Sequence, residues 1–216
     1  MTAMRSPTFF DGRKIVIVKV LLIVSNVFLQ EAHASLPRKW IPDSTGNVTS
    51  DEIGSIFGTV VSFSGDGTLM AVGEPWRTND VMSVTKAGRC SVYEKSSDGL
   101  SWTRVFVLDG DATDTFVGSG CKVARDVRRV VVGAYGYVNR GLVEVWGDET
   151  VSGEWTRIGN PLVGSVSPTS NTDDFGWDVD ITANGDVIAI GAPKLDSTTV
   201  KGKAYVYILN TSTNTW

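Results

Sequence analysis

A unit of roughly 60 residues recurs three times along this chain. Its opening glycines, Gly58, Gly118 and Gly176, are 60 and 58 residues apart, and each is followed 15 residues later by a second glycine, at Gly73, Gly133 and Gly191. A third glycine opens a run that ends in an aromatic residue (Gly88 to Tyr93, Gly141 to Trp146, Gly202 to Tyr207), and a tryptophan stands nine residues beyond each aromatic, at Trp102, Trp155 and Trp216. Self-similarity at a regular period predicts a repeat architecture in which neighbouring units complete each other's core.

Each copy has the hydrophobic pattern of four short strands. The first and third runs alternate apolar and polar residues, which is typical of strands with two different faces, whereas the second run is continuously apolar and predicts a strand covered on both faces. In the third copy this second run is Val187 to Ile190. Asp66-Gly67 and Asn184-Gly185 separate the first and second runs and favour tight hairpin turns.

The pattern therefore predicts an all-β, propeller-like fold with three four-stranded antiparallel blades, at about residues 55–112, 113–165 and 172–216. We expect the recurring tryptophan to wedge between neighbouring blades. Propellers close with about four to eight blades, so three blades form an open arc. Further blades from a longer parent chain, or a second subunit, would then cover the end blades.

The N-terminus lies outside the repeat and resembles a secretory signal peptide, residues 1–34. Arg13 and Lys14 precede an apolar run from Ile15 to Leu29, and Ala32-His33-Ala34 supplies a small-x-small cleavage site. A membrane anchor is the alternative, but the run of 15 residues is short for a span, which needs about 20. Residues 35–54 form a polar lead-in. The chain is expected to be secreted, with no membrane insertion of its mature part.

Without this leader, 16 basic and 22 acidic residues remain, a formal net charge of −6. Nucleic-acid partners and anionic membrane surfaces favour a basic patch, so neither is expected. Asn47 and Asn210 lie in glycosylation sequons. Cys90 and Cys121 both stand at inward-facing positions, where they are either two small buried hydrophobic residues or a disulfide between neighbouring blades.

The sequence offers few groups for catalysis. Its one histidine, His33, lies in the leader, so the mature chain has no imidazole for a nucleophilic triad or a zinc site. Asp173, Asp174, Asp178 and Asp180 cluster at the start of the third copy, where we expect a solvated acidic strand end. The sequence predicts no catalytic residue, no cofactor and no metal, and calcium in particular is not expected.

Several of these landmarks resemble the FG-GAP repeats of integrin α-subunit propellers. The resemblance covers about Ser55 to Trp216 and is carried by Phe57-Gly58, Phe175-Gly176 and Gly191-Ala192-Pro193. It implies a seven-bladed type of propeller, found in many secreted or surface proteins. Many members hold calcium between strands one and two, but the turns here, Ser64 to Gly67 and Ala183 to Asp186, lack the aspartate-rich ligand set.

The scaffold and the resemblance predict an extracellular interaction module without catalysis, which binds a protein or a glycan through loops at the blade ends. Trp76, Tyr135 and Tyr137 lie in loops of variable length and are the candidate contact aromatics. The alternatives are a secreted carbohydrate-active enzyme with paired carboxylates and a structural surface component. An enzyme requires two carboxylates that converge in one cleft.

Overall fold

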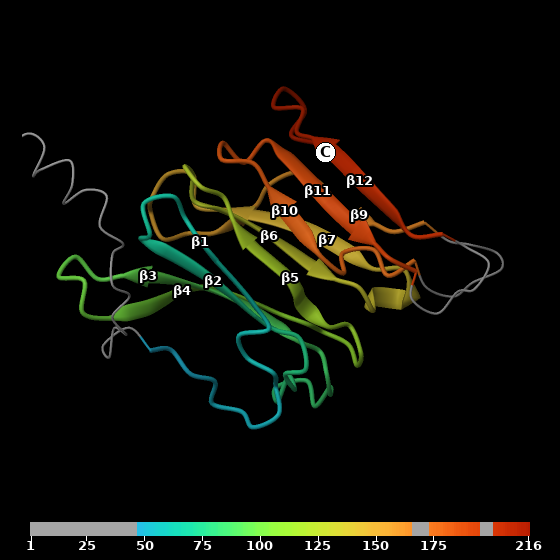
Figure 1. Ribbon diagram of the computed structural model, residues 1–216, viewed down its shortest axis with the longest axis horizontal. Helices are drawn as coiled ribbons and strands as arrows, with labels where there is room; N and C mark the ends of the chain where they lie inside the picture. The colour runs from blue at the N-terminus through green and yellow to red at the C-terminus, as the bar shows by residue number, and fades with distance from the viewer. Residues whose placement is uncertain (1–46, 166–172, 195–200) are drawn as a thin grey trace, which may run out of the picture. The chain divides into compact units, whose positions relative to one another are not determined.

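The computed structural model describes residues 47–165, 173–194 and 201–216, all within the second of the two units, 1–43 and 44–216, into which the chain divides. The described residues form three antiparallel sheets in chain order (Figure 1) and no α-helix. The all-β, propeller-like prediction is therefore confirmed. No helix in these ranges is long and apolar enough to cross a membrane.

The first sheet has the predicted four strands in sequence order: β1 (Val60–Phe63), β2 (Leu69–Glu74), β3 (Arg89–Lys95) and β4 (Trp102–Asp109). Gly67 closes the β1–β2 turn with a φ of 71°, and Gly185 plays the same part in the third sheet with a φ of 75°. Both are the glycines of the dipeptides that favoured turns, and both adopt a backbone conformation that other residues rarely accept.

The second sheet contains five strands: β5 (Val117–Val123), β6 (Arg129–Ala134), β7 (Leu142–Gly147), β8 (Thr156–Arg157) and β9 (Leu162–Val163). Four were predicted. The expected outer strand is divided in two, since β8 and β9 both pair with β7. Gly159, with a φ of 74°, and Pro161, which has no N–H to donate, stand between the two pieces. A short 3-10 turn, η1 (Tyr137–Asn139), lies between β6 and β7.

The third sheet has three strands in the described residues: β10 (Val179–Ile181), β11 (Val187–Ala192) and β12 (Lys203–Ile208). The predicted fourth strand is absent from residues 173–194 and 201–216. The register of β11 with β12 places Ala189 opposite Val206, so these two side chains share one face of the sheet.

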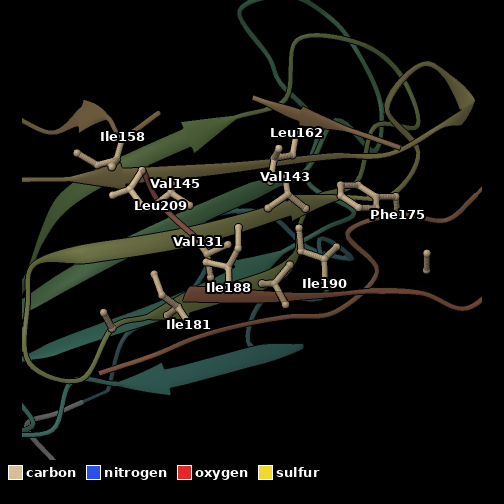
Figure 2. Packing of buried hydrophobic residues seen from close by; sticks show 13 residues of the cluster. Val131, Val143, Val145, Ile158, Leu162, Phe175, Ile181, Ile188, Ile190 and Leu209 are labelled. Carbon is tan, nitrogen blue, oxygen red and sulfur yellow. The ribbon is translucent and has the colours of Figure 1, made fainter. Parts of the chain in front are cut away.

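Two apolar cores lie between the sheets. One joins the first and second sheets through residues such as Val92 and Val130, and the other joins the second and third through residues such as Val145 and Ile188 (Figure 2). Strand β2 is buried along its whole length, as its continuous apolar run predicts. In β11, by contrast, Ala189 is exposed, because one face of the third sheet has no neighbouring sheet among the described residues.

Two of the three recurring tryptophans have the wedge role that we expected between sheets. Trp155 packs on Phe106 of the first sheet, with ring centroids 5.0 Å apart. Trp216 packs against the second core, and its Nε1 donates a hydrogen bond of 2.8 Å to the carbonyl of Ile158. Trp102 instead lies beside Phe63 on the outer face of the first sheet.

Of the two alternatives for the cysteines, the structure contains the disulfide. It joins Cys90 of β3 to Cys121 of β5, with Cα atoms 5.9 Å apart, and both residues are fully buried. The bond therefore crosses from the first sheet to the second. The signal peptide, 1–34, and most of the lead-in, 35–54, lie outside the described residues and stay predictions.

Candidate functional site

A cavity of about 440 Å³ opens where the three sheets meet at one end of their strands. Every sheet contributes to its wall. The lining residues are Ile56, Thr59, Val60, Pro75, Trp76, Ser119, Tyr135, Trp177 and Asp178. Its volume falls within the range of roughly 300–1,000 Å³ that is common for small-molecule sites.

Three aromatic side chains, one from each repeat, dominate this cavity. The rings of Tyr135 and Trp177 have centroids 4.6 Å apart, and Phe116 stacks on Tyr135 at the same distance. Trp76 and Trp177 are 47% and 40% exposed, respectively. The ammonium of Lys86 lies 5.3 Å from the centre of the Trp76 ring. Large, partly exposed aromatic faces are characteristic of binding surfaces.

The repeat itself places these residues. Trp177 directly follows the opening glycine Gly176, just as Thr59 and Ser119 follow Gly58 and Gly118. The backbones are tightly packed here, since a Cβ on Gly133 would stand 2.1 Å from the carbonyl oxygen of Gly176. A Cβ on Gly73 would likewise stand 2.1 Å from the carbonyl oxygen of Gly118. The opening glycines of the second and third repeats thus lie against the preceding repeat, and the residue after each opening glycine lines the same cavity.

Polar groups at the cavity wall are few. The Ser119 hydroxyl is within hydrogen-bond distance of the carbonyl of Gly176, at 3.1 Å, and of Gly133, at 3.3 Å. Asp178 is exposed and supplies the one carboxylate among the described lining residues. Burial raises the pKa of the Tyr135 phenol, and the nearby charges of Asp174 and Asp114 raise it further. Tyr135 is therefore a neutral hydroxyl at physiological pH.

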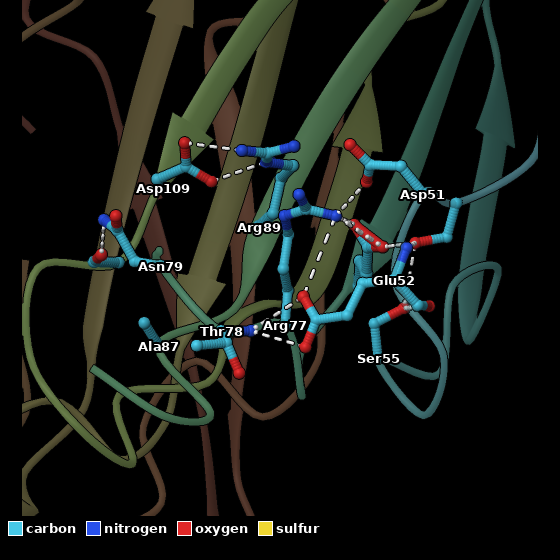
Figure 3. A network of polar contacts seen from close by, with 12 residues as sticks. Asp51, Glu52, Ser55, Arg77, Thr78, Asn79, Ala87, Arg89 and Asp109 are labelled. Carbon is cyan, nitrogen blue, oxygen red and sulfur yellow. Dashed lines mark hydrogen bonds and ion pairs between the residues drawn. The ribbon is translucent and has the colours of Figure 1, made fainter. Parts of the chain in front are cut away.

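The loop that carries Trp76 is anchored by an ion-pair network (Figure 3). Arg77, whose side chain is 8% exposed, pairs with Asp51 at 2.5 Å and with Glu74 at 3.4 Å. The Arg77 hydrogen bond, together with its charge, holds the pKa of Asp51 below its ordinary value. The backbone N–H of Thr78 donates to Glu52 at 3.1 Å. These contacts tie residues 51 and 52 to the loop and fix the backbone on one side of Trp76.

The predicted contact aromatics divide into two groups. Trp76 and Tyr135 both line the cavity, whereas Tyr137 lies in η1 and packs against the first core. Sequence reasoning missed Trp177 as a contact aromatic, and it considered Asp178 only as part of an acidic strand end. Their positions, one and two residues after the opening glycine, are the signal that could have identified them.

In the first hairpin turn, the Asp66 carboxylate accepts hydrogen bonds from residues of the turn itself. The Asp66 oxygens accept hydrogen bonds from Ser64 at 2.6 Å and from the backbone N–H of Thr68 at 3.0 Å. These bonds, led by that of Ser64, lower the pKa of Asp66 to about 2. In the described parts of the chain, no three His, Cys, Asp or Glu side chains are grouped as a metal site would need.

The two predicted glycosylation sites are not among the residues that line the cavity. Asn47 and Asn210 are both exposed, and Asn210 lies in the turn that follows β12. Asp178 and Asp180 sit on the same side of β10, opposite Val179 and Ile181, and each accepts a hydrogen bond from the next residue's backbone N–H.

Three successive antiparallel sheets with one shared register define a propeller-type repeat module. Residues 167–207, which span most of the third repeat, match the family model of the FG-GAP repeat. This match confirms the resemblance for that repeat, and it includes Trp177 and Asp178 of the cavity. No curated protein is similar enough to the chain to be counted as a relative.

Proposed function

We propose that this chain is a secreted or cell-surface interaction module that binds a glycan in the cavity lined by Trp76, Tyr135 and Trp177, without catalysis. The observation that carries the proposal is the convergence of these three aromatic residues, from three separate repeats, on one hollow of about 440 Å³.

A sugar ring suits this wall. The C–H faces of a pyranose are apolar and pack flat on aromatic rings, while its hydroxyls need a few hydrogen-bond partners at the edge. The cavity supplies aromatic faces through Trp76 and Trp177, and polar groups through Ser119, Tyr135 and Asp178. A hollow of about 440 Å³ has the size of a small-molecule site, whereas a protein partner usually needs a broad flat contact of about 800 Å² per partner.

Several features support an extracellular setting. The buried Cys90–Cys121 disulfide suits an oxidising compartment. Both sequon asparagines are exposed, and the N-terminal sequence is typical of a secretory leader. The acidic balance of the chain favours neither nucleic acid nor anionic membrane surfaces as partners.

The enzyme alternative finds less support at this site. Hydrolysis of a glycoside by paired carboxylates requires two acids on opposite sides of the bond. Of the described residues that line the cavity, Asp178 alone is a carboxylate. Binding without cleavage therefore fits the wall better than catalysis does.

A protein ligand is the second candidate, and one observation favours it. Val81 and Met82, in the loop after Trp76, are 96% and 53% exposed. Two adjacent exposed apolar residues at a loop tip are a common feature of protein-binding surfaces.

One set of variants separates the two candidates. Trp76→Ala and Trp177→Ala should each weaken glycan binding about tenfold or more, which corresponds to about 1.4 kcal/mol. Val81→Asp with Met82→Asp should leave glycan binding unchanged, and it serves as the matched control outside the cavity. Binding is measured first on a glycan array and then by titration calorimetry with the best glycan. An array without a hit that depends on Trp177 overturns the glycan proposal.

A further inference from the structure

The cavity of the candidate site combines aromatic faces with a negative charge. The partly exposed rings of Trp76 and Trp177 both line it, together with Tyr135, whose ring centroid is 4.6 Å from that of Trp177. Asp178 directly follows Trp177 and lines the same wall, whereas no lysine or arginine does so among the described residues. Aromatic faces beside a carboxylate are typical of sites for organic ammonium groups, because both the π face and the carboxylate attract positive charge.

The Asp178 carboxylate is not neutralised by a basic side chain of its own chain. Other aspartates of the sheets form ion pairs with arginine (Asp109, Asp148 and Asp186). Asp178 forms none within the described ranges, and its Oδ1 accepts a hydrogen bond of 2.9 Å from the backbone N–H of Val179. Because Asp178 lines the cavity, its negative charge is available to a ligand there.

The other charges that act on the wall also favour a cation. Burial raises the pKa of the Tyr135 phenol, and the charges of Asp174 and Asp114 raise it further, so the electrostatic potential at this ring is negative. The ammonium of Lys86 lies 5.3 Å from the centre of the Trp76 ring, but Lys86 is not among the residues that line the cavity. Its position shows that this ring attracts positive charge.

We propose that the cavity selects glycans with free, protonated amino groups, an inference that rests on the glycan binding proposed above. The C–H face of the sugar packs on a tryptophan ring, and the ammonium at the edge of the sugar pairs with Asp178. A neutral sugar makes only the aromatic contact, and a uronic acid meets the like charge of Asp178. Positively charged glycans should therefore bind more tightly than neutral ones, and neutral ones more tightly than negatively charged ones.

The experiment compares three tetrasaccharides of the same β-1,4 linkage that differ in charge, built from glucosamine, glucose or glucuronic acid. Titration calorimetry with the oxidised full chain is done at mildly acidic pH, where the amine is protonated and carboxylates stay charged. The glucosamine tetrasaccharide should bind about tenfold more tightly than the glucose one, since an exposed ion pair and a cation–π contact each contribute severalfold. This preference should shrink in about 0.5 M salt, which screens the charges.

Three variants test the assigned roles. Asp178→Asn keeps the size of the side chain but removes its charge, and it should reduce the preference for glucosamine over glucose to about threefold or less. Asp180→Asn is the matched control, because Asp180 is exposed on the same side of β10 but does not line the cavity. It should retain the wild-type preference. Trp177→Ala should weaken the binding of both the glucosamine and the glucose tetrasaccharide.

The outcomes separate this inference from the proposed function. Amino-sugar selection is overturned, while glycan binding stands, if the glucose or glucuronic acid tetrasaccharide binds at least as tightly as the glucosamine one. The same holds if Asp178→Asn and Asp180→Asn change the preference equally. If the glucosamine tetrasaccharide does not bind at all, the selection also fails. The glycan array then decides the proposed function separately, because a hit that depends on Trp177 would preserve glycan binding.

Discussion

The two contacts between neighbouring sheets share a register but differ in how they are held. The contact of the first and second sheets contains the Cys90–Cys121 disulfide. The contact of the second and third has Val143 and Val179 at the corresponding positions, and both are buried. The covalent bond is therefore an addition to one contact and not a requirement of the fold.

The second contact also contains a large aromatic residue, Phe175, at the position where the first contact has Val117. Phe175 is 1% exposed, and its ring packs edge-on against Tyr205 with centroids 5.3 Å apart. Phe57, which stands at the same place in the first repeat, is only partly buried. The residue before the opening glycine should therefore contribute most to the free energy of unfolding where a neighbouring sheet encloses it. This difference gives the first test.

Phe175→Ala should have the largest effect of the single substitutions. Removal of a fully enclosed phenylalanine costs about 3–5 kcal/mol, because it forfeits both the transfer of the ring from water and the packing around it. The matched control, Phe57→Ala, should cost less than half as much. Urea unfolding of both variants measures the difference in free energy. Equal losses would show that the enclosing sheet contributes nothing at this position.

Loss of the disulfide should have the second-largest effect on stability. Cys90→Ala with Cys121→Ala removes a crosslink over a sequence separation of 31 residues. Chain-entropy arguments give a loss of about 3–4 kcal/mol for a loop of this size. Thermal unfolding with and without a reducing agent tests this. The wild-type chain should become less stable on reduction, whereas the double variant should not respond. A response of the variant would mean that reduction acts elsewhere.

Asp148 tests the polar part of the first contact. Its carboxylate accepts hydrogen bonds from the backbone N–H groups of Ser152 and Gly153, and it pairs at 3.2 Å with Arg128, which reaches Glu94 of the first sheet at 2.6 Å. Burial alone would raise the pKa of Asp148, but these partners outweigh it and the pKa is lowered.

A lowered carboxyl pKa means that the stabilisation is present above the unfolded-state pKa, about 3.9, and is lost as the pH falls through the lower folded-state value. Asp148→Asn should therefore cost about 2 kcal/mol at pH 7, and the two chains should converge in stability below pH 4. Urea unfolding from pH 7 to pH 3 measures this, with Asp126→Asn as the exposed control. If the difference in stability between the two chains stayed constant over this pH range, the charge of Asp148 would not be its cause.

The sequence predicted the parts of the fold that depend on local pattern. Glycine spacing and apolar runs identified β2, β6 and β11, because these strands are continuous and central. The split of the outer strand into β8 and β9 was missed, since Gly159 and Pro161 lie between landmarks that otherwise repeat. Whether Cys90 and Cys121 were bonded depended on a distance between sheets, and sequence alone does not contain that distance.

The candidate site was predicted in part, for a similar reason. Trp76 and Tyr135 were found because they lie in loops, where binding residues are common. Trp177 was missed, because it lies just before a strand and not in one of the loops of variable length. Tyr137 was selected by the same loop rule, but it packs on the core. Loop position therefore indicates exposure only where the loop does not fold back.

The smallest expected effect concerns Arg129, the counterpart in the second contact of Arg128 in the first. Arg129 pairs with Asp186 of the third sheet at 2.7 Å and with Glu149 at 2.5 Å, and these acids are 36% and 50% exposed. Exposed pairs contribute about 0.2–1 kcal/mol each and are screened by salt. Arg129→Met should thus cost about 1 kcal/mol in dilute buffer and less in 1 M salt, as measured by urea unfolding.

Arg157→Met, whose pair with Glu144 stays inside the second sheet, is the matched control. A loss above about 2 kcal/mol that persists in salt would contradict the ion-pair explanation. It would point instead to the hydrogen bond of 3.0 Å that Arg129 donates to the carbonyl of Gly185.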